Sequence, residues 1–268
     1  MTLNAEHYGT PIAMIMTKDE KKKSSQIISL DDSNQAKNPF NELTLSKPGQ
    51  MFQVVGDPKR ERDIIYISGR SGSGKSYFIK DYVNNYYKLI HKKRPVYLFS
   101  ALKEDPTIDQ IKGLLRIDLS LDFLADEEIT VADFANSCVI FDDTDTLKNK
   151  LIRDKVNYLL DEILETGRHF EITCLITKHC PANGRETKLI LAESHQFVLF
   201  INGLGNKTLK YLLDNYLGLD NDQIKKIKKT KGRWVSINRS TFPMSVVSEK
   251  ECFILNNKDN DEDDTIDV

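Results

Sequence analysis

The sequence lacks the cysteine pattern of a metal site or of a disulfide framework. Its four cysteines, Cys138, Cys174, Cys180 and Cys252, are scattered, and no two stand at a short paired spacing such as C-x2-C. Three of them adjoin apolar stretches. We therefore expect buried free thiols in a protein of a reducing compartment.

Long apolar runs are also absent. The longest are far shorter than the roughly 18 residues that a membrane-spanning helix needs. The first residues, MTLNAEHYGTPIAM, contain neither the basic nor the apolar region of a secretory signal. These absences argue against a membrane span and against secretion.

A large net charge is missing as well, but the charge is unevenly distributed. The last ten residues, DNDEDDTIDV, carry six carboxylates and no base, so the remaining 38 bases and 34 acids give +4. Such a mildly basic body permits a nucleic-acid partner without requiring one. The first fifty residues are polar and show no sustained period. We predict a partly irregular polar extension (1–50), one folded domain (51–256) and a disordered acidic tail (257–268).

From residue 51 onward, short apolar runs alternate with amphipathic segments. The predicted strands are β-branched and aromatic, at 51–55, 63–68, 95–100, 136–143, 171–177 and 195–202. Helical spacing of apolar residues predicts helices over 76–92, 150–166, 207–217 and 220–230. Ile90 and Leu151 belong to the predicted inward faces of the first two helices, and Gly167 ends the second. Two or three short strands close the chain. This alternation predicts an α/β fold with a mostly parallel sheet covered by helices.

The segment GRSGSGKS (69–76) matches the phosphate-loop pattern G-x-x-x-x-G-K-[ST] in full. In this motif, backbone N–H groups of a tight loop and the positive end of the next helix surround phosphate oxygens. Lys75 is expected to reach the β- and γ-phosphates of ATP, and Ser76 to ligate Mg²⁺. The strand before the loop and the helix after it argue against an ordinary glycine-rich surface loop. The predicted nucleotide-binding residues are Gly69, Arg70, Ser71, Gly72, Ser73, Gly74, Lys75, Ser76 and Tyr77.

A second motif, CVIFDDTD (138–145), is an apolar strand that ends in two carboxylates, as a Walker B element does. Asp142 is the predicted Mg²⁺ ligand, and Asp143 the residue that orients and polarises the attacking water. Aspartates at a strand end also cap turns, which is the alternative for this pair.

Two other classes of P-loop enzyme fit the chain less well. A GTPase would have D-x-x-G after this strand, whereas residues 142–145 are DDTD, and Cys180 stands where the base-reading aspartate of [NT]-K-x-D is needed. A nucleotide kinase would have an arginine-rich lid, whereas residues 101–135 contain only Arg116. We therefore expect hydrolysis of ATP.

Two residues flank the predicted strand at 171–177. If this strand lies between those of the phosphate loop and of Asp142, His179 at its carboxyl end can sense the γ-phosphate. Arg168, at the opposite end, cannot reach its own site but can face that of a neighbouring subunit, as an arginine finger supplied in trans must. Arg168 as a surface arginine favoured by a helix C-terminus, and His179 as a structural histidine, are the alternatives.

These motifs resemble the DNA-packaging ATPases of large double-stranded DNA viruses, a branch of the FtsK–HerA class of ring ATPases. The resemblance covers roughly residues 60–255 and rests on the phosphate loop, VIFDD, GRHF, ITKH and R-TKLIL-E. It implies a P-loop NTPase sandwich of three layers, of the additional-strand, RecA-like type. It also implies that Arg168 is the trans finger, with Arg185 as the second candidate, and that His179 is the sensor. Many members of the class have Glu where this chain has Asp143, and often Gln where it has His179.

The resemblance further implies the function and the partners. It implies an ATP-driven motor that forms a homo-oligomeric ring of five or six subunits and moves double-stranded DNA, independently of its sequence, into a capsid. Capsid proteins would be further partners, and the protein would act in the host cytoplasm, in the viral factory or with the virion. A HerA-like translocase or helicase of repair or segregation, and a non-catalytic nucleotide-binding scaffold, are the alternatives.

One basic stretch, QIKKIKKTKGRW (223–234), is a candidate for DNA contact, although lysine runs are usually only solvated surface. We expect Trp234 in the core rather than stacked on a base. The candidate DNA contacts are Lys225, Lys226, Lys228, Lys229, Lys231 and Arg233.

Overall fold

The computed structural model describes residues 1–17, 26–126 and 129–255, apart from the side chains of Arg185 and Glu186. The predicted acidic tail (257–268) lies outside the described residues. None of the helices in the described part combines the length and the apolarity that crossing a membrane requires.

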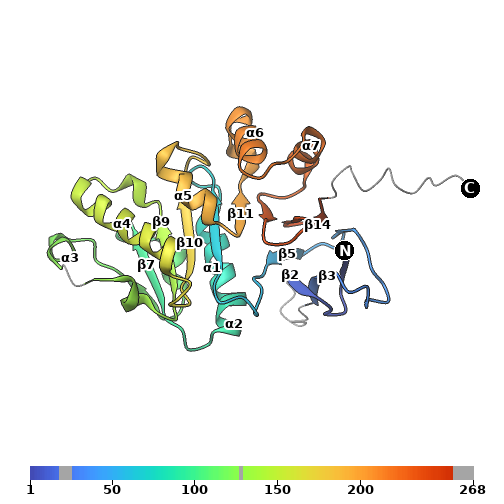
Figure 1. Ribbon diagram of the computed structural model, residues 1–268, viewed down its shortest axis with the longest axis horizontal. Helices are drawn as coiled ribbons and strands as arrows, with labels where there is room; N and C mark the ends of the chain where they lie inside the picture. Colours follow the sequence, from blue (N-terminus) through green and yellow to red (C-terminus); the bar gives the residue numbers. More distant parts are fainter. Residues whose placement is uncertain (18–25, 127–128, 256–268) are drawn as a thin grey trace, which may run out of the picture.

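A central sheet, of ten strands within the described residues, organises the molecule (Figure 1). Its order is β4-β14-β13-β12-β11-β6-β10-β9-β7-β8. Six neighbouring strands run parallel: β6 (Ile64–Ser68), β7 (Val96–Ser100), β8 (Leu114–Arg116), β9 (Cys138–Asp142), β10 (Thr173–Lys178) and β11 (Gln196–Leu199). The others are antiparallel and form one edge: β12 (Val235–Asn238), β13 (Ser245–Ser248), β14 (Glu251–Ile254) and β4 (Glu42–Thr44). The prediction of a mostly parallel sheet is therefore confirmed.

Helices cover both faces of this sheet. On one face pack α4 (Lys150–Thr166), α5 (Arg185–Glu193), α6 (Asn206–Asn215) and α7 (Asn221–Lys229). On the other lies one continuous helix made of α1 (Lys75–Asp81), a π-helical segment (Tyr82–Tyr87) and α2 (Lys88–Ile90). The strands supply alternate residues to the two faces, since Tyr66 packs with the α4 layer and Ile65 and Ile67 with the α1 layer. The chain thus forms the expected three-layer sandwich.

Short elements complete the connections. They are α3 (Leu121–Ala125) and the 3₁₀ turns Ile108–Gln110, Val131–Phe134, Thr144–Thr146 and Ile201–Gly203.

The first fifty residues contribute strands to both sheets. A second sheet has the order β1-β3-β2-β5 and consists of β1 (Thr2–Asn4), β2 (Thr10–Thr17), β3 (Gln26–Asp31) and β5 (Gln50–Val54). Leu3, Ile12 and Phe52 are almost fully buried, in the same apolar cluster as the α1 face of the central sheet. In Figure 1 this second sheet lies beside β14, at the end of the molecule opposite α3. The strand predicted at 51–55 therefore exists but pairs with β2 rather than with the central sheet. A domain boundary at residue 50 stays a prediction.

Three residues differ from their predicted environments. Ile90 is 42% exposed because the π-helical segment before it changes the residue spacing and turns the later positions away from the sheet. Leu151, in the first turn of α4, is 63% exposed, whereas its neighbour Ile152 faces the core. Cys180 is exposed, while the other three cysteines are buried free thiols as expected.

Candidate active site

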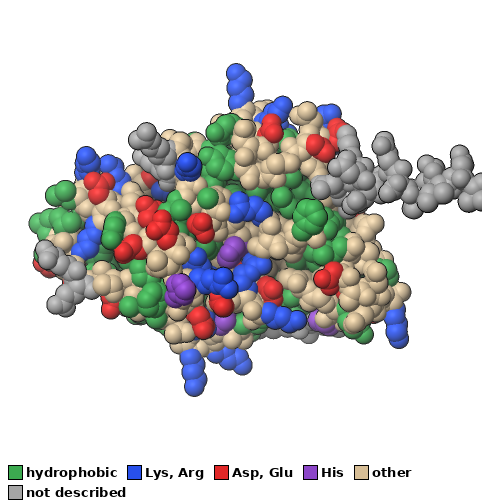
Figure 2. Space-filling model, viewed as in Figure 1, with side chains coloured by type: hydrophobic (Ala, Val, Ile, Leu, Met, Phe, Trp, Pro, Cys, Tyr) green, Lys and Arg blue, Asp and Glu red, His purple; other side chains and the backbone are tan. Residues whose placement is uncertain are grey.

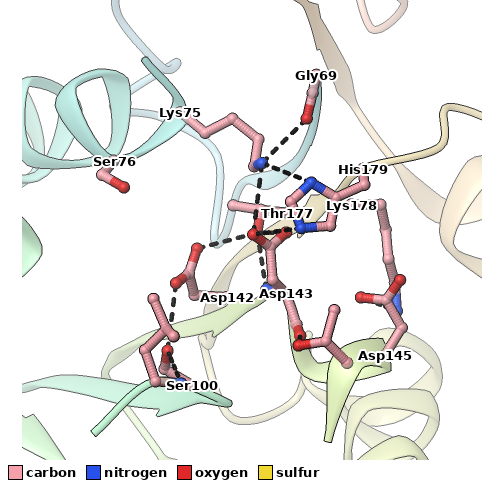
Figure 3. Close-up of polar contacts among 12 residues, drawn as sticks. Gly69, Lys75, Ser76, Ser100, Asp142, Asp143, Asp145, Thr177, Lys178 and His179 are labelled. Carbon is pink, nitrogen blue, oxygen red and sulfur yellow. Dashed lines mark hydrogen bonds and ion pairs between the residues drawn. The ribbon is translucent and has the colours of Figure 1, made fainter. Parts of the chain in front are cut away.

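The phosphate loop connects β6 to α1 at the carboxyl edge of the parallel strands. Gly74 caps α1 with φ 110°, a conformation that favours glycine. At Gly69, a β-carbon would approach Phe200 Cβ and Ser73 Oγ to 2.7 Å, so the loop needs a glycine there as well. Lys75 is buried, and its ammonium donates to the Gly69 carbonyl oxygen at 3.0 Å (Figure 3). The loop therefore has the glycines and the buried cation that the motif predicts.

Asp142 is the last residue of the Walker B strand β9, two strands away from β6, and Asp143 follows it directly. Asp142 is buried and accepts hydrogen bonds from Ser100 Oγ at 3.2 Å and from Thr177 Oγ1 at 3.0 Å. Burial, and next the negative charge of Asp143, raise the pKa of Asp142, while the two hydroxyl donors oppose the shift. A cation beside this carboxylate would relieve both unfavourable effects.

β10 lies between β6 and β9, so His179, directly after β10, meets both motifs. Figure 3 shows Lys75, Asp143 and His179 turned toward one another. Lys75 Nζ lies 3.4 Å from Asp143 Oδ2 and 3.3 Å from His179 Nδ1, and His179 Nε2 lies 3.1 Å from the same carboxylate oxygen. Because an ammonium group only donates, Nδ1 accepts and Nε2 carries the proton that it donates to Asp143. The three side chains form one hydrogen-bonded group.

Side-chain oxygen atoms near the phosphate loop are candidate ligands for a magnesium ion. Ser76 Oγ donates to Asp105 Oδ2 at 3.0 Å, and Asp105 also contributes to the raised pKa of Asp142. Oxygen ligands of this kind suit Mg²⁺, which commonly takes one or two protein carboxylates and completes its shell with water and substrate phosphates. The described residues contain no group of three or more His, Cys, Asp or Glu side chains placed to hold a metal. Ser76 and Asp142 therefore fit the predicted ion.

Arg168 lies far from this group, in the turn between α4 and β10. His179 follows the other end of β10, and the six residues of this strand span ~20 Å. The Arg168 side chain is 71% exposed and forms an ion pair with Glu61. The turn is held by Arg62, whose guanidinium donates to the carbonyl oxygens of Ile163 and Leu164 at 2.5 and 2.6 Å, at the end of α4. Arg168 is thus placed on an exposed turn at the edge opposite the nucleotide loop, as the sequence predicts. Arg185, the second candidate, begins α5, and its side chain lies outside the described part.

Three of the six basic residues of 223–234 form ion pairs with acidic side chains. Lys225 pairs with Asp222 at 3.1 Å, Lys226 with Glu42 at 3.0 Å and Arg233 with Glu249 at 2.7 Å. On the face in Figure 2, lysine and arginine side chains are interspersed with acidic ones and form no continuous stripe. Trp234 is 7% exposed and packs edge-to-face on Phe78, as expected for a core residue. DNA contact by this stretch stays a prediction.

Sequence reasoning missed the three polar residues that hold the acids and the loop: Ser100, Asp105 and Thr177. Ser100 and Thr177 stand at the carboxyl ends of β7 and β10, the strands on either side of β9. A polar residue at the end of an apolar parallel strand was the available signal. Asp105 lies in the loop after β7, where no sequence pattern marks it.

Comparison with known proteins identifies a relative by sequence and solved structures with the same fold. No protein-family model matches the sequence. Protein V3 of the Sputnik virophage, which is described as uncharacterized, is 34% identical over 250 residues, which cover 92% of this chain and 96% of V3.

Solved structures show the same fold. The genome packaging NTPase B204 from Sulfolobus turreted icosahedral virus 2, in complex with AMP, superposes with a TM-score of 0.51 at 16% identity, over 71% of this chain and 98% of B204. B204 of Sulfolobus turreted icosahedral virus, a DNA-packaging ATPase, gives 0.50 at 17% identity over the same shares. The chain therefore belongs to the same protein family as V3 of the Sputnik virophage, and it has the P-loop fold of viral genome-packaging NTPases, which confirms the resemblance seen in its sequence.

Proposed function

We propose that the protein is an ATP-hydrolysing motor subunit that forms a ring of five or six copies and drives double-stranded viral DNA into a capsid. One observation carries the proposal: the phosphate-loop lysine, the second Walker B acid and a histidine from the strand between them meet in a single group. In this arrangement Lys75 would neutralise charge on the γ-phosphate, and the adjacent Asp143 would act as the base that accepts a proton from the attacking water. The family relationship to a virophage protein and the fold of packaging NTPases agree with it.

Each residue of the site would have its own role in the proposed hydrolysis. Ser76 and Asp142 would hold Mg²⁺, which would neutralise charge on the phosphate oxygens. Lys75, which is bound to the Gly69 carbonyl and to Asp143, would exchange these partners for the β- and γ-phosphates. Asp143 would then be free to accept a proton from the attacking water, and the Nε2–H of His179 would donate a hydrogen bond to the acid or to the γ-phosphate. ATP rather than GTP is proposed because the GTPase motifs are missing.

The position of Arg168 supports the proposed ring. An exposed arginine at the edge opposite the loop cannot serve its own site but can complete the site of the next subunit. Its ion pair with Glu61 would have to open when the subunits meet. Lys228, Lys229 and Lys231 are the better candidates for DNA contact, because the other three bases of that stretch already have acidic partners.

The test measures ATP turnover of the full chain with and without long double-stranded DNA, together with the mass of the particle in solution. We expect DNA to stimulate turnover by a particle of several subunits. Arg168→Ala should lower turnover by ~10³-fold or more, because arginine fingers contribute ~10³–10⁵ in rate, while the variant still binds nucleotide. Lys207→Ala, which changes an exposed base on α6, is the matched control and should behave as wild type. A monomer that binds nucleotide but never hydrolyses it would contradict the motor and favour a scaffold.

A further inference from the structure

A groove runs along α1 on the side that faces the N-terminal sheet. It has a volume of about 260 Å³ and lies between the first turns of α1, strands β2 and β5, and the start of β12. Its lining includes the exposed ring of Tyr77, the largely buried rings of Phe78 and Trp234, and Met16 and Met51 from the N-terminal strands. The phosphate chemistry described above does not use this groove.

The groove begins at the phosphate loop. Gly74, the N-cap of α1, lines its end, and Arg233 lines both this groove and the neighbouring cavity over residues 70–73. Arg233 is held in this position by Glu249, whose Oε1 accepts from its Nε at 2.8 Å. Arg233 is therefore the residue that the groove and the cavity over the loop share.

The strand order decides in which direction a nucleotide must extend. Lys75, Asp143 and His179 fix the γ-phosphate end toward β10 and β9. β11 and β12 lie on the other side of β6, so the nucleoside end must leave the loop in their direction. Arg233 and Trp234 mark this side, because they directly precede β12. The groove lies on this side, as does the cavity over residues 70–73.

The lining suits a flat aromatic ligand. Tyr77 directly follows Ser76, the proposed Mg²⁺ ligand, and its ring is 54% exposed, although burial of so large a ring would be favourable. Thioethers such as those of Met16 and Met51 make favourable contacts with aromatic rings. The amides within the groove are already engaged, since Gln53 Nε2 donates to the Asp81 carbonyl at 2.5 Å and Asn85 Nδ2 donates to Gln53 Oε1 at 3.1 Å. Stacking and apolar contact, rather than hydrogen bonds to the edge of the base, would then dominate.

We propose that this groove holds the purine base of the nucleotide, so that the N-terminal strands form part of the nucleotide site and Arg233 faces nucleotide rather than DNA. The inference rests on the proposed function, because it assumes that the loop binds a nucleoside triphosphate. It assigns the first fifty residues a role in ligand binding.

The test compares two ligands of the full chain with Mg²⁺ present: a non-hydrolysable ATP analogue and inorganic tripolyphosphate, which lacks the base. Tyr77→Ala removes an exposed ring and Met51→Glu places a charge in the groove. Each should weaken binding of the analogue by about tenfold, as loss of one stacking contact does, and leave tripolyphosphate binding unchanged. Tyr158→Ala, which removes a 65% exposed ring on α4, is the control and should leave both affinities unchanged.

The possible outcomes separate the two proposals. If Tyr77→Ala weakens the binding of both ligands equally, or does not weaken the binding of the analogue, the base site is refuted, even if the wild type hydrolyses ATP. If Tyr77→Ala weakens the binding of the analogue alone, the base site is supported. This holds even if the wild type does not hydrolyse ATP, a result that would refute only the proposal of a motor. If Met51→Glu does not fold, as its thermal unfolding would reveal, Tyr77→Ala decides the question.

Discussion

Thr177 links the two Walker B acids through one hydroxyl group. Its Oγ1 lies 3.0 Å from Asp142 Oδ1 and 2.9 Å from Asp143 Oδ1, and it accepts the backbone N–H of Asp143 at 2.9 Å. Asp143 has φ 47°, a left-handed conformation that costs about 1–3 kcal/mol in a residue other than glycine. The hydrogen bond from its N–H to β10 therefore helps to hold the acid in the conformation that directs it toward Lys75 and His179.

Thr177→Val should impair turnover more than nucleotide binding. Valine keeps the shape of threonine but leaves the Asp143 N–H without its acceptor, which costs about 1–3 kcal/mol when the group is buried. We expect kcat to fall by roughly tenfold or more and KM to change less, because Asp143 loses its fixed position while Asp142 keeps Ser100 as a donor. Thr177→Ser retains the hydroxyl and should stay close to wild type. Wild-type kcat in the valine variant would show that the hydroxyl does not position the acid.

Pairing between strands explains both what the sequence predicts and what it misses. The central strands were predictable because both of their faces are buried, so their residues are apolar throughout. The strand at 51–55 was recognised, but its partner was not, because alternation within a strand does not specify its neighbour. The phosphate loop and the two acids were recognised as local motifs. Thr177 and Asp105 were not, because their roles arise only when distant segments meet at one edge of the sheet.

At the scale of an element, His195 stabilises the start of β6 in a way that depends on pH. His195 directly precedes β11, and its Nδ1 accepts a hydrogen bond from the backbone N–H of Ile64, the first residue of β6, at 3.2 Å. Burial, and then the positive charges of Arg60, Arg62 and Arg239, lower the pKa of His195 to about 3. In the unfolded chain the imidazole titrates near its ordinary pKa of ~6.5. The unfolded state thus binds more protons between these values, so stability falls as the pH drops below about 6.5.

His195→Asn should reduce this acid sensitivity. The side-chain oxygen of asparagine can replace Nδ1 as an acceptor, but it does not titrate. Between pH 7 and about pH 5, we expect the free energy of unfolding of wild type to fall by about 2 kcal/mol more than that of the variant. Urea unfolding at the two pH values measures the difference. His169→Asn changes an exposed imidazole and should keep the wild-type slope. Identical slopes in His195→Asn and wild type would refute the role of His195.

At the scale of the whole molecule, the sheet separates the phosphate loop from Arg168, the proposed arginine finger. The loop, Asp142 and Asp143 lie at the carboxyl edge of the parallel strands, whereas Arg168 lies in a turn at the opposite edge. A rigid three-layer domain cannot bring these edges together by bending. If Arg168 contributes to hydrolysis, a second copy of the chain must present it, with the loop surface of one subunit facing the Arg168 surface of the next. Repetition of such a head-to-tail contact closes a ring where the rotation between neighbouring subunits closes on itself.

Mixing two inactive variants tests this arrangement directly. Lys75→Ala removes the phosphate-binding cation but keeps Arg168, and Arg168→Ala keeps an intact loop. Each alone should be almost inactive, but in mixed rings an Arg168→Ala site that faces a Lys75→Ala neighbour regains its finger, so ATP turnover should return to a substantial fraction of wild type. The double variant mixed with Arg168→Ala supplies no finger at all and is the matched control. If mixing restores nothing, although mass measurement shows that mixed rings form, Arg168 does not act in trans. Arg185, at the start of α5, then becomes the residue to test in the same way.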